Sequence, residues 1–108
     1  MPIKEVANFS VSLLQVLDES GVIDEKLDPG LDRGQLVELY SAMLLARQTD
    51  QRMINLQRQG RIGTFAPAIG QEAAICGPVF AMRPTDWFVG SYRELGGRLL
   101  RNEPLENI

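Results

Sequence analysis

Histidine is missing from the 108 residues, and the only cysteine is Cys76. Without imidazole, neither a histidine-based catalytic triad nor a histidine metal site can form within this chain. One thiol cannot form an intramolecular disulfide, and with no signal peptide recognisable we expect a reducing, cytoplasmic setting. The apolar runs are too short to cross a bilayer, so we expect no membrane partner.

Lysine is scarce as well, and the charges are unevenly distributed. Residues 1–32 hold seven acids and two lysines, whereas all nine bases of residues 33–108 are arginines. The strong basic excess of nucleic-acid-binding proteins is absent, so we expect no nucleic-acid partner. Arginine favours ion pairs and anion recognition, although a codon bias toward arginine would give the same composition. The glycine spacings also do not fit a phosphate-binding loop of the P-loop or dinucleotide type.

Composition is that of one globular domain, with 44% hydrophobic and 23% charged residues. We expect residues 1–31 to form an extended N-terminal arm. In it, an apolar run over residues 11–17, a turn at 18–21 and Val22-Ile23 predict a short hairpin. An arm of this kind buries little by itself, so we expect it to lie against the rest of the chain or a partner.

The clearest element is a helix that starts after Asp32 and ends near Gly60. Asp32 is a good N-cap, and Gln35 completes the spacing of a capping box. Arg47 and Asp50 are three residues apart, which allows an ion pair on the helix surface. We interpret these charges as a solvated face, with a buried network facing a partner as the alternative.

Two shorter helices are expected further along. The first begins at about Gly70, with Glu72 in its first turn as a partner of the helix dipole rather than an acid/base group. Pro78 should kink or split it. The second takes in residues 94–101 with Asn102 after its end, and residues 104–108 resemble the first turn of another helix. Residues 87–89, Trp-Phe-Val, predict a short buried strand.

Tyr92 and Arg93 follow that expected strand directly. Ligands of open α/β sheets bind beyond the carboxyl ends of strands, and a guanidinium fork matches phosphate or carboxylate. The two residues could therefore clamp a diphosphate; an ordinary arginine–acid pair beside a packing tyrosine is the alternative. Phe65, in the loop before Gly70, could line a pocket, or this loop could be a plain connector.

Four blocks of the chain form a recognisable series: Arg58-Gln59-Gly60-Arg61-Ile62-Gly63, Ala66-Pro67-Ala68-Ile69-Gly70-Gln71-Glu72-Ala73, Arg83-Pro84-Thr85-Asp86-Trp87 and Ser91-Tyr92-Arg93-Glu94-Leu95-Gly96. In this order they resemble the α subunit of the thiamine-diphosphate-dependent 2-oxo acid dehydrogenases, and bacterial pyruvate dehydrogenase α subunits are the most similar. The resemblance runs from about Asp32 to Ile108 and more weakly over the arm.

The resemblance implies an α/β fold, with residues 32–108 as the incomplete N-terminal part of a thiamine-diphosphate-binding domain. It is expected to be mostly helical, with one or more short strands. The implied reaction is oxidative decarboxylation of a 2-oxo acid, pyruvate foremost, with acyl transfer to a lipoyl group of a partner acyltransferase. The implied assembly is an α₂β₂ heterotetramer with a β subunit.

The resemblance also assigns roles to residues. Tyr92 and Arg93 would contact the diphosphate of the cofactor, and Phe65 would lie near the substrate pocket. The ligands of the Mg²⁺ ion would lie beyond residue 108, so we expect no metal ligand and no catalytic residue here, and no activity from these 108 residues alone. Many relatives carry histidines where this chain has Ala66 and Leu95, so other groups would have to replace them.

Other functions remain open. A branched-chain 2-oxo acid or acetoin dehydrogenase α subunit would share these motifs. A small helical protein-interaction module without catalysis is the alternative of another class.

Overall fold

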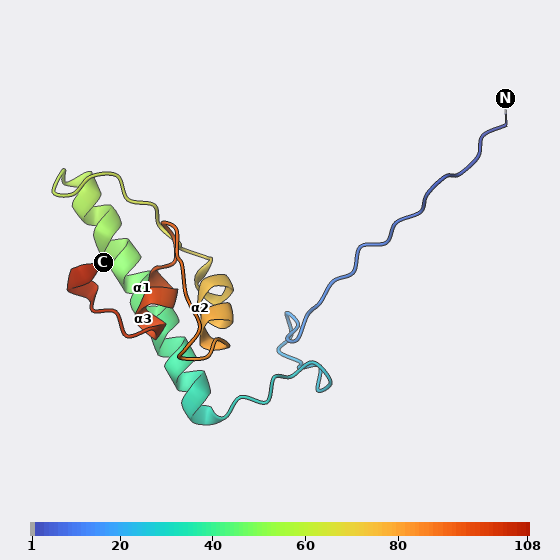
Figure 1. The fold of residues 1–108 in the computed structure, drawn as a ribbon, viewed down its shortest axis with the longest axis horizontal. Helices are drawn as coiled ribbons and strands as arrows, with labels where there is room; N and C mark the ends of the chain where they lie inside the picture. The colour runs from blue at the N-terminus through green and yellow to red at the C-terminus, as the bar shows by residue number, and fades with distance from the viewer. Residues whose placement is uncertain (1) are drawn as a thin grey trace. The chain divides into compact units, whose positions relative to one another are not determined.

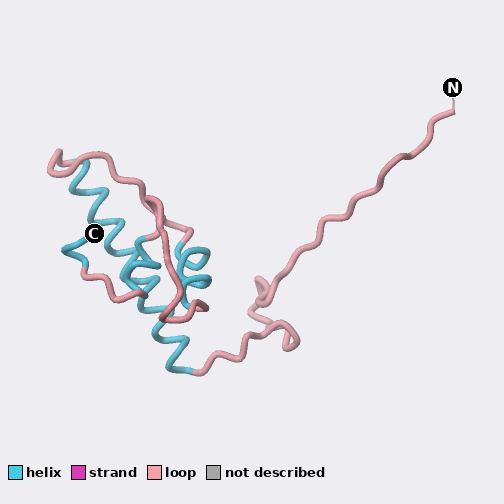
Figure 2. The backbone as a smooth tube through the Cα atoms, viewed as in Figure 1, coloured by secondary structure: helices cyan, strands magenta, loops and turns pink. Residues whose placement is uncertain are grey.

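A computed structural model describes residues 2–108, in which helices are joined by long loops (Figures 1 and 2). The chain divides into two compact units, the residues up to Gly30 and the unit Leu31–Ile108. Each unit is described by itself below.

The first unit is extended apart from two turns, one at residues 18–21 and one at residues 24–28. The Asp18 carboxylate accepts hydrogen bonds from the backbone N–H groups of Ser20 and Val22 at 2.9 and 2.8 Å. Gly21 takes the left-handed conformation that the turn needs, with φ of 83°. Leu17 and Ile23 then form an isolated antiparallel bridge. The predicted hairpin is thus present as a turn and a single bridge.

The second unit is organised on α1, Arg33–Arg58, which starts with a capping box. The Asp32 carboxylate accepts from the Gln35 backbone N–H at 2.9 Å, and the Gln35 side chain accepts from the Asp32 N–H at 3.0 Å. Gly60, with φ of 69°, follows the helix end. The predicted start and end of this helix are confirmed.

Two short helices pack on α1 and on each other: α2, Glu72–Phe80, and α3, Leu95–Leu100 (Figure 1). Pro78 lies inside α2 without splitting it, so of the two predicted effects, a kink or a split, the split is wrong. The residue before this proline is Gly77, which has no Cβ to clash with the proline ring.

A small core lies where the three helices meet. Its buried apolar members are Ala46, Ala68, Cys76, Val79 and Leu95. Small side chains and the two buried glycines of α3 let the helix backbones approach closely. Beyond α3, Asn102 adopts a left-handed φ of 59°, and a 3-10 turn, η1, follows at Leu105–Asn107. In residues 2–108, no helix has the length and apolar character needed to cross a membrane.

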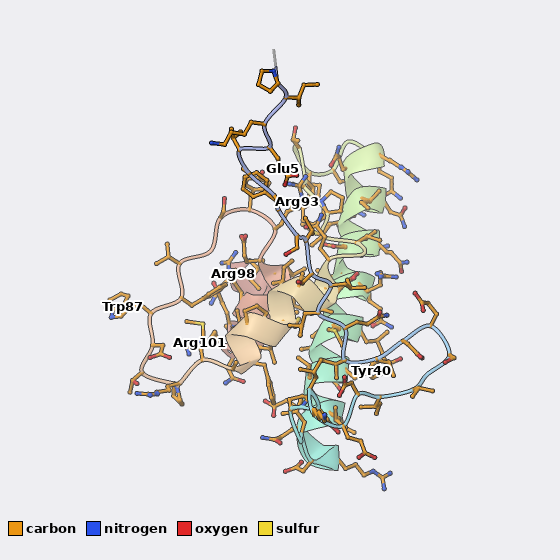
Figure 3. The ribbon with its side chains drawn as sticks, turned by 90° about the vertical axis from the view of Figure 1, so that its right-hand side faces the viewer. Glu5, Tyr40, Trp87, Arg93, Arg98 and Arg101 are labelled. Atoms are coloured by element: carbon orange, nitrogen blue, oxygen red, sulfur yellow. The ribbon has the colours of Figure 1, made fainter. Side chains whose placement is uncertain are left out.

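The expected strand at residues 87–89 is not formed, and residues 2–108 contain no strand longer than an isolated bridge. The mostly helical character is therefore confirmed, whereas the short strand is wrong. A strand needs a neighbour for its backbone hydrogen bonds, and the described part of the chain offers none. Trp87 is 91% exposed and points away from the helices (Figure 3), whereas Phe88 packs against α3 near Gly97.

Candidate functional site

A cavity of about 470 Å³ lies in the second unit and gathers all three residues that the sequence singled out. Its walls come from the middle of α1, the loop before α2, the segment before α3, and the chain's last residues. Phe65 reaches it from the first loop, and Tyr92 and Arg93 reach it from the segment before α3. Two segments that are distant in sequence therefore share one space.

Arg93 is held in two ways at this cavity. Its Nε donates a hydrogen bond to the Pro67 carbonyl at 3.2 Å, and its guanidinium carbon lies 4.9 Å from the centre of the Tyr92 ring. Among the described residues, the two terminal nitrogens of Arg93 have no hydrogen-bond or ion-pair partner, and the arginine–acid pair that was the alternative is not formed. Tyr92 is 69% exposed.

The other charges around the cavity already have partners. Arg98 and Glu103 form an ion pair at 2.5 Å that lowers the pKa of the Glu103 carboxyl. The Glu94 carboxylate accepts from the backbone N–H groups of Ser91 and Arg93 at 2.6 and 3.1 Å, so it shapes the turn that carries Tyr92. Arg93 is thus the lining cation that, in the described part of the chain, is free to meet an added anion.

Arg47 forms an ion pair, although not with the residue expected. Both its Nε and its Nη2 donate to the carboxylate of Glu72, the second at 3.0 Å. Glu72 is buried and also accepts from the Gly70 backbone N–H at 2.9 Å. The Arg47 hydrogen bond is the main cause that holds the pKa of Glu72 at about 2. The interpretation of Arg47 as part of a solvated face is therefore wrong, because its guanidinium pairs with a buried carboxylate of α2. Spacing within one helix gives no signal for a partner 25 residues away.

Asp50 is 1% exposed, borders the cavity and forms no ion pair with Arg47 among the described residues. Its Oδ2 accepts a hydrogen bond from the Ala68 backbone N–H at 2.7 Å. Burial raises the pKa of the Asp50 carboxyl, and this hydrogen bond opposes the rise. Sequence reasoning missed this role. The available signal was helical register, because Asp50 stands one turn after the buried Ala46.

The loop before α2 is therefore tied down at several points by side chains of α1 and α2. Besides the bonds to Ala68 and Gly70, the Phe65 backbone N–H donates to the Gln57 side chain at 2.9 Å. Backbone donors in a loop lack the partners that a helix would give them. These bonds supply such partners and fix the wall that carries Phe65.

A metal centre is not assembled by this part of the chain. In residues 2–108, no group of three or more histidine, cysteine, aspartate or glutamate side chains is placed to hold an ion. What the site offers is an arginine with free terminal nitrogens, a phenol and an aromatic wall. This arrangement can bind an anion beside an apolar group.

Comparison with known proteins points to one family. The model of the family described as "Dehydrogenase E1 component" matches residues 40–108. A relative named pyruvate dehydrogenase E1 component subunit alpha, from Acholeplasma laidlawii, is 44% identical over 92 residues, covering 84% of this chain and 27% of the relative. Proteins of the same name from Staphylococcus aureus and Staphylococcus epidermidis are 42% identical over 94 residues, covering 86% of this chain. The chain spans about a quarter of the length of these relatives.

Proposed function

This chain belongs to the dehydrogenase E1 component family, and on that premise we propose that it is the N-terminal part of a pyruvate dehydrogenase α subunit. The activity would be oxidative decarboxylation of pyruvate, with acyl transfer to a lipoyl group of a partner acyltransferase. The names of the similar relatives favour pyruvate over branched-chain 2-oxo acids or acetoin as the substrate.

The family implies thiamine diphosphate, and the cavity suits the anionic end of such a molecule. The terminal nitrogens of Arg93 are without partners in the described residues, and Tyr92 adds an exposed phenol beside them. A guanidinium presents a planar fork of donors that matches phosphate oxygens. When bound, thiamine diphosphate would supply the carbon nucleophile that attacks a 2-oxo acid. Arg93 would bind and orient the diphosphate, Tyr92 would add a hydrogen bond, and neither would take part in the bond changes.

The rest of the site must come from other polypeptide. The described residues provide no metal cluster, so the Mg²⁺ that would accompany the diphosphate takes its ligands elsewhere. Phe65 would form an apolar wall on the substrate side of the cavity. We propose a β subunit as partner in a heterotetramer of two α and two β chains, acting in the cytoplasm.

The observation that carries this proposal is the guanidinium of Arg93, which borders the cavity and whose terminal nitrogens have no partner among residues 2–108. The test is calorimetric titration of thiamine diphosphate with Mg²⁺ into the intact α subunit assembled with its β subunit. Loss of a hydrogen bond to a charged group costs about 1.5–3 kcal/mol, so Arg93→Ala should weaken binding roughly 10-fold or more.

Arg33→Ala is the matched control, because it removes the same charge from an exposed position at the start of α1. It should bind the cofactor like the wild type. Equal affinities of Arg93→Ala and Arg33→Ala would refute the diphosphate grip. A stable monomer that binds an unrelated helix would instead favour the helical interaction module.

A further inference from the structure

One peptide group of the loop before α2 is bonded at both of its ends to charged side chains. Its N–H, from Ala68, donates to the Asp50 carboxylate at 2.7 Å, and its C=O, from Pro67, accepts from the Arg93 Nε at 3.2 Å. Asp50 comes from the middle of α1 and Arg93 from the segment before α3. The Pro67–Ala68 peptide therefore links a buried acid to the base at the cavity.

The signs of the charges agree with the dipole of this peptide. Its N–H and C=O point in opposite directions, since no peptide bond of the described chain is cis. The carboxylate faces the positive end, and the guanidinium faces the negative end. Hydrogen bonds with one ionised member are shorter and stronger than neutral ones, and bonds in a chain polarise one another. The peptide is thus held in one orientation from both sides.

The orientation of the Arg93 guanidinium depends on the Pro67–Ala68 peptide. The Tyr92 ring supports its face, but a stacking contact leaves the guanidinium free to rotate in its own plane. The bond from Nε to Pro67 removes that freedom, so the direction of the two terminal nitrogens follows the position of the Pro67 carbonyl. The position of that carbonyl follows in turn from the Ala68–Asp50 bond.

We propose that Asp50 is a positioning residue, which orients the Arg93 guanidinium toward the bound anion through the Pro67–Ala68 peptide. This inference rests on the proposed function, because it takes the anion to be the diphosphate of the cofactor. Asp50 also borders the cavity, but its side chain is 1% exposed and its Oδ2 already accepts from the Ala68 N–H, so we assign it to positioning rather than to binding the anion.

A double-mutant cycle separates this role from a general loss of loop structure. The proteins are the intact α subunit with its β subunit, carrying Asp50→Ala, Arg93→Ala or both changes. The probe is thiamine diphosphate with Mg²⁺, titrated by calorimetry, and thermal unfolding without cofactor reports stability separately. Residues that act through one another are non-additive, whereas independent sites add.

We expect Asp50→Ala to weaken binding about 5- to 10-fold, less than Arg93→Ala does. The double variant should bind within about twofold of Arg93→Ala alone, because Asp50 has nothing left to orient. Asp50→Asn keeps an oxygen acceptor for the Ala68 N–H, so it should stay within about twofold of the wild type. Asp86→Ala is the control: it removes a carboxylate that accepts a backbone N–H, here from Arg83, at an exposed turn that does not line the cavity.

The outcomes are distinguishable. Suppose that Arg93→Ala weakens binding, and that Asp50→Ala either has no effect or weakens binding by the same factor whether or not Arg93 is present. Either result overturns the positioning role of Asp50 and leaves the proposed function standing. If Arg93→Ala binds like the wild type, the cofactor grip fails, and the inference fails with it. Should Asp50→Ala not fold, Asp50→Ser takes its place in the cycle, because its hydroxyl is too short to reach the Ala68 N–H but keeps the site polar.

Discussion

The thiol of Cys76 in α2 occupies the space that a side chain on Gly96 of α3 would need. A Cβ built on Gly96 would lie 2.5 Å from the Cys76 Sγ, which is shorter than real contacts allow. Cys76 is fully buried, so the sulfur has little room to move. The close approach of α2 and α3 therefore depends on a glycine at this position.

Gly96→Ala should destabilise the intact protein by about 1–3 kcal/mol, because an added methyl group overpacks this contact. The measurement is the free energy of unfolding from a urea titration. Gly63→Ala is the matched control, since Gly63 has open space around its Cα and a φ outside the left-handed region. There the same change should be neutral or should stabilise the protein by up to about 1 kcal/mol. Equal losses at the two positions would contradict the packing argument.

The free energy of unfolding should depend on pH through the titration of Glu72. Its pKa is about 2 in the folded state and 4.5 in an ordinary peptide, so the unfolded chain binds more protons between these values. Stability from the Arg47–Glu72 pair is therefore complete above about pH 4.5 and is lost as pH falls toward 2. Glu72→Gln removes this titration.

The gap in unfolding free energy between the wild type and Glu72→Gln should be widest at pH 5 to 7 and should narrow as pH falls to 2. Glu106→Gln, which removes a carboxylate from an exposed position of η1, is the control for net charge. A gap that stays constant over this range would show that Glu72 titrates normally.

The thiol of Cys76 should react with alkylating reagents only when the helices separate. Its side chain is fully buried, and this burial raises the pKa of the thiol, so little thiolate is available. Peptide mass spectrometry after brief treatment with iodoacetamide should find Cys76 unmodified in the native protein and modified in urea. In Gly96→Ala, the weakened packing should make this alkylation faster under native conditions. Rapid labelling of the native wild-type protein would refute the buried position.

The elements that local signals define were predictable from the sequence. Asp32 and Gln35 make a capping box, and Gly60 marks the end of α1, because caps and terminators act over a few residues. The family was also identified correctly from four short blocks, and its model matches residues 40–108. Local chemistry and ordered motifs are what a single sequence shows most directly.

The predictions that are wrong concern contacts with residues distant in the chain. The segment at Trp87 has the composition of a strand, but a strand forms only where another strand offers backbone partners, and the described residues do not. Arg47 was assigned a partner three residues away, although Glu72 reaches it from the next helix. Spacing within α1 predicts a surface charge at Asp50, whereas its carboxylate is buried and accepts a hydrogen bond from the Ala68 N–H. Tyr92, Arg93 and Phe65 border one cavity, but their roles remain predictions that the titrations above address.

The order of the two residues at positions 67 and 68 has its own consequence. Proline can stand at 67 because that position contributes only an oxygen, and the fixed φ of its ring stiffens the chain beside the acid. Alanine must not be replaced by proline at 68, since a ring nitrogen there has no hydrogen to give to Asp50. A swapped Ala-Pro dipeptide, identical in composition and nearly identical in bulk, would leave a carboxylate stranded in the interior. The order Pro67-Ala68 therefore cannot be reversed without loss of the hydrogen bond to Asp50.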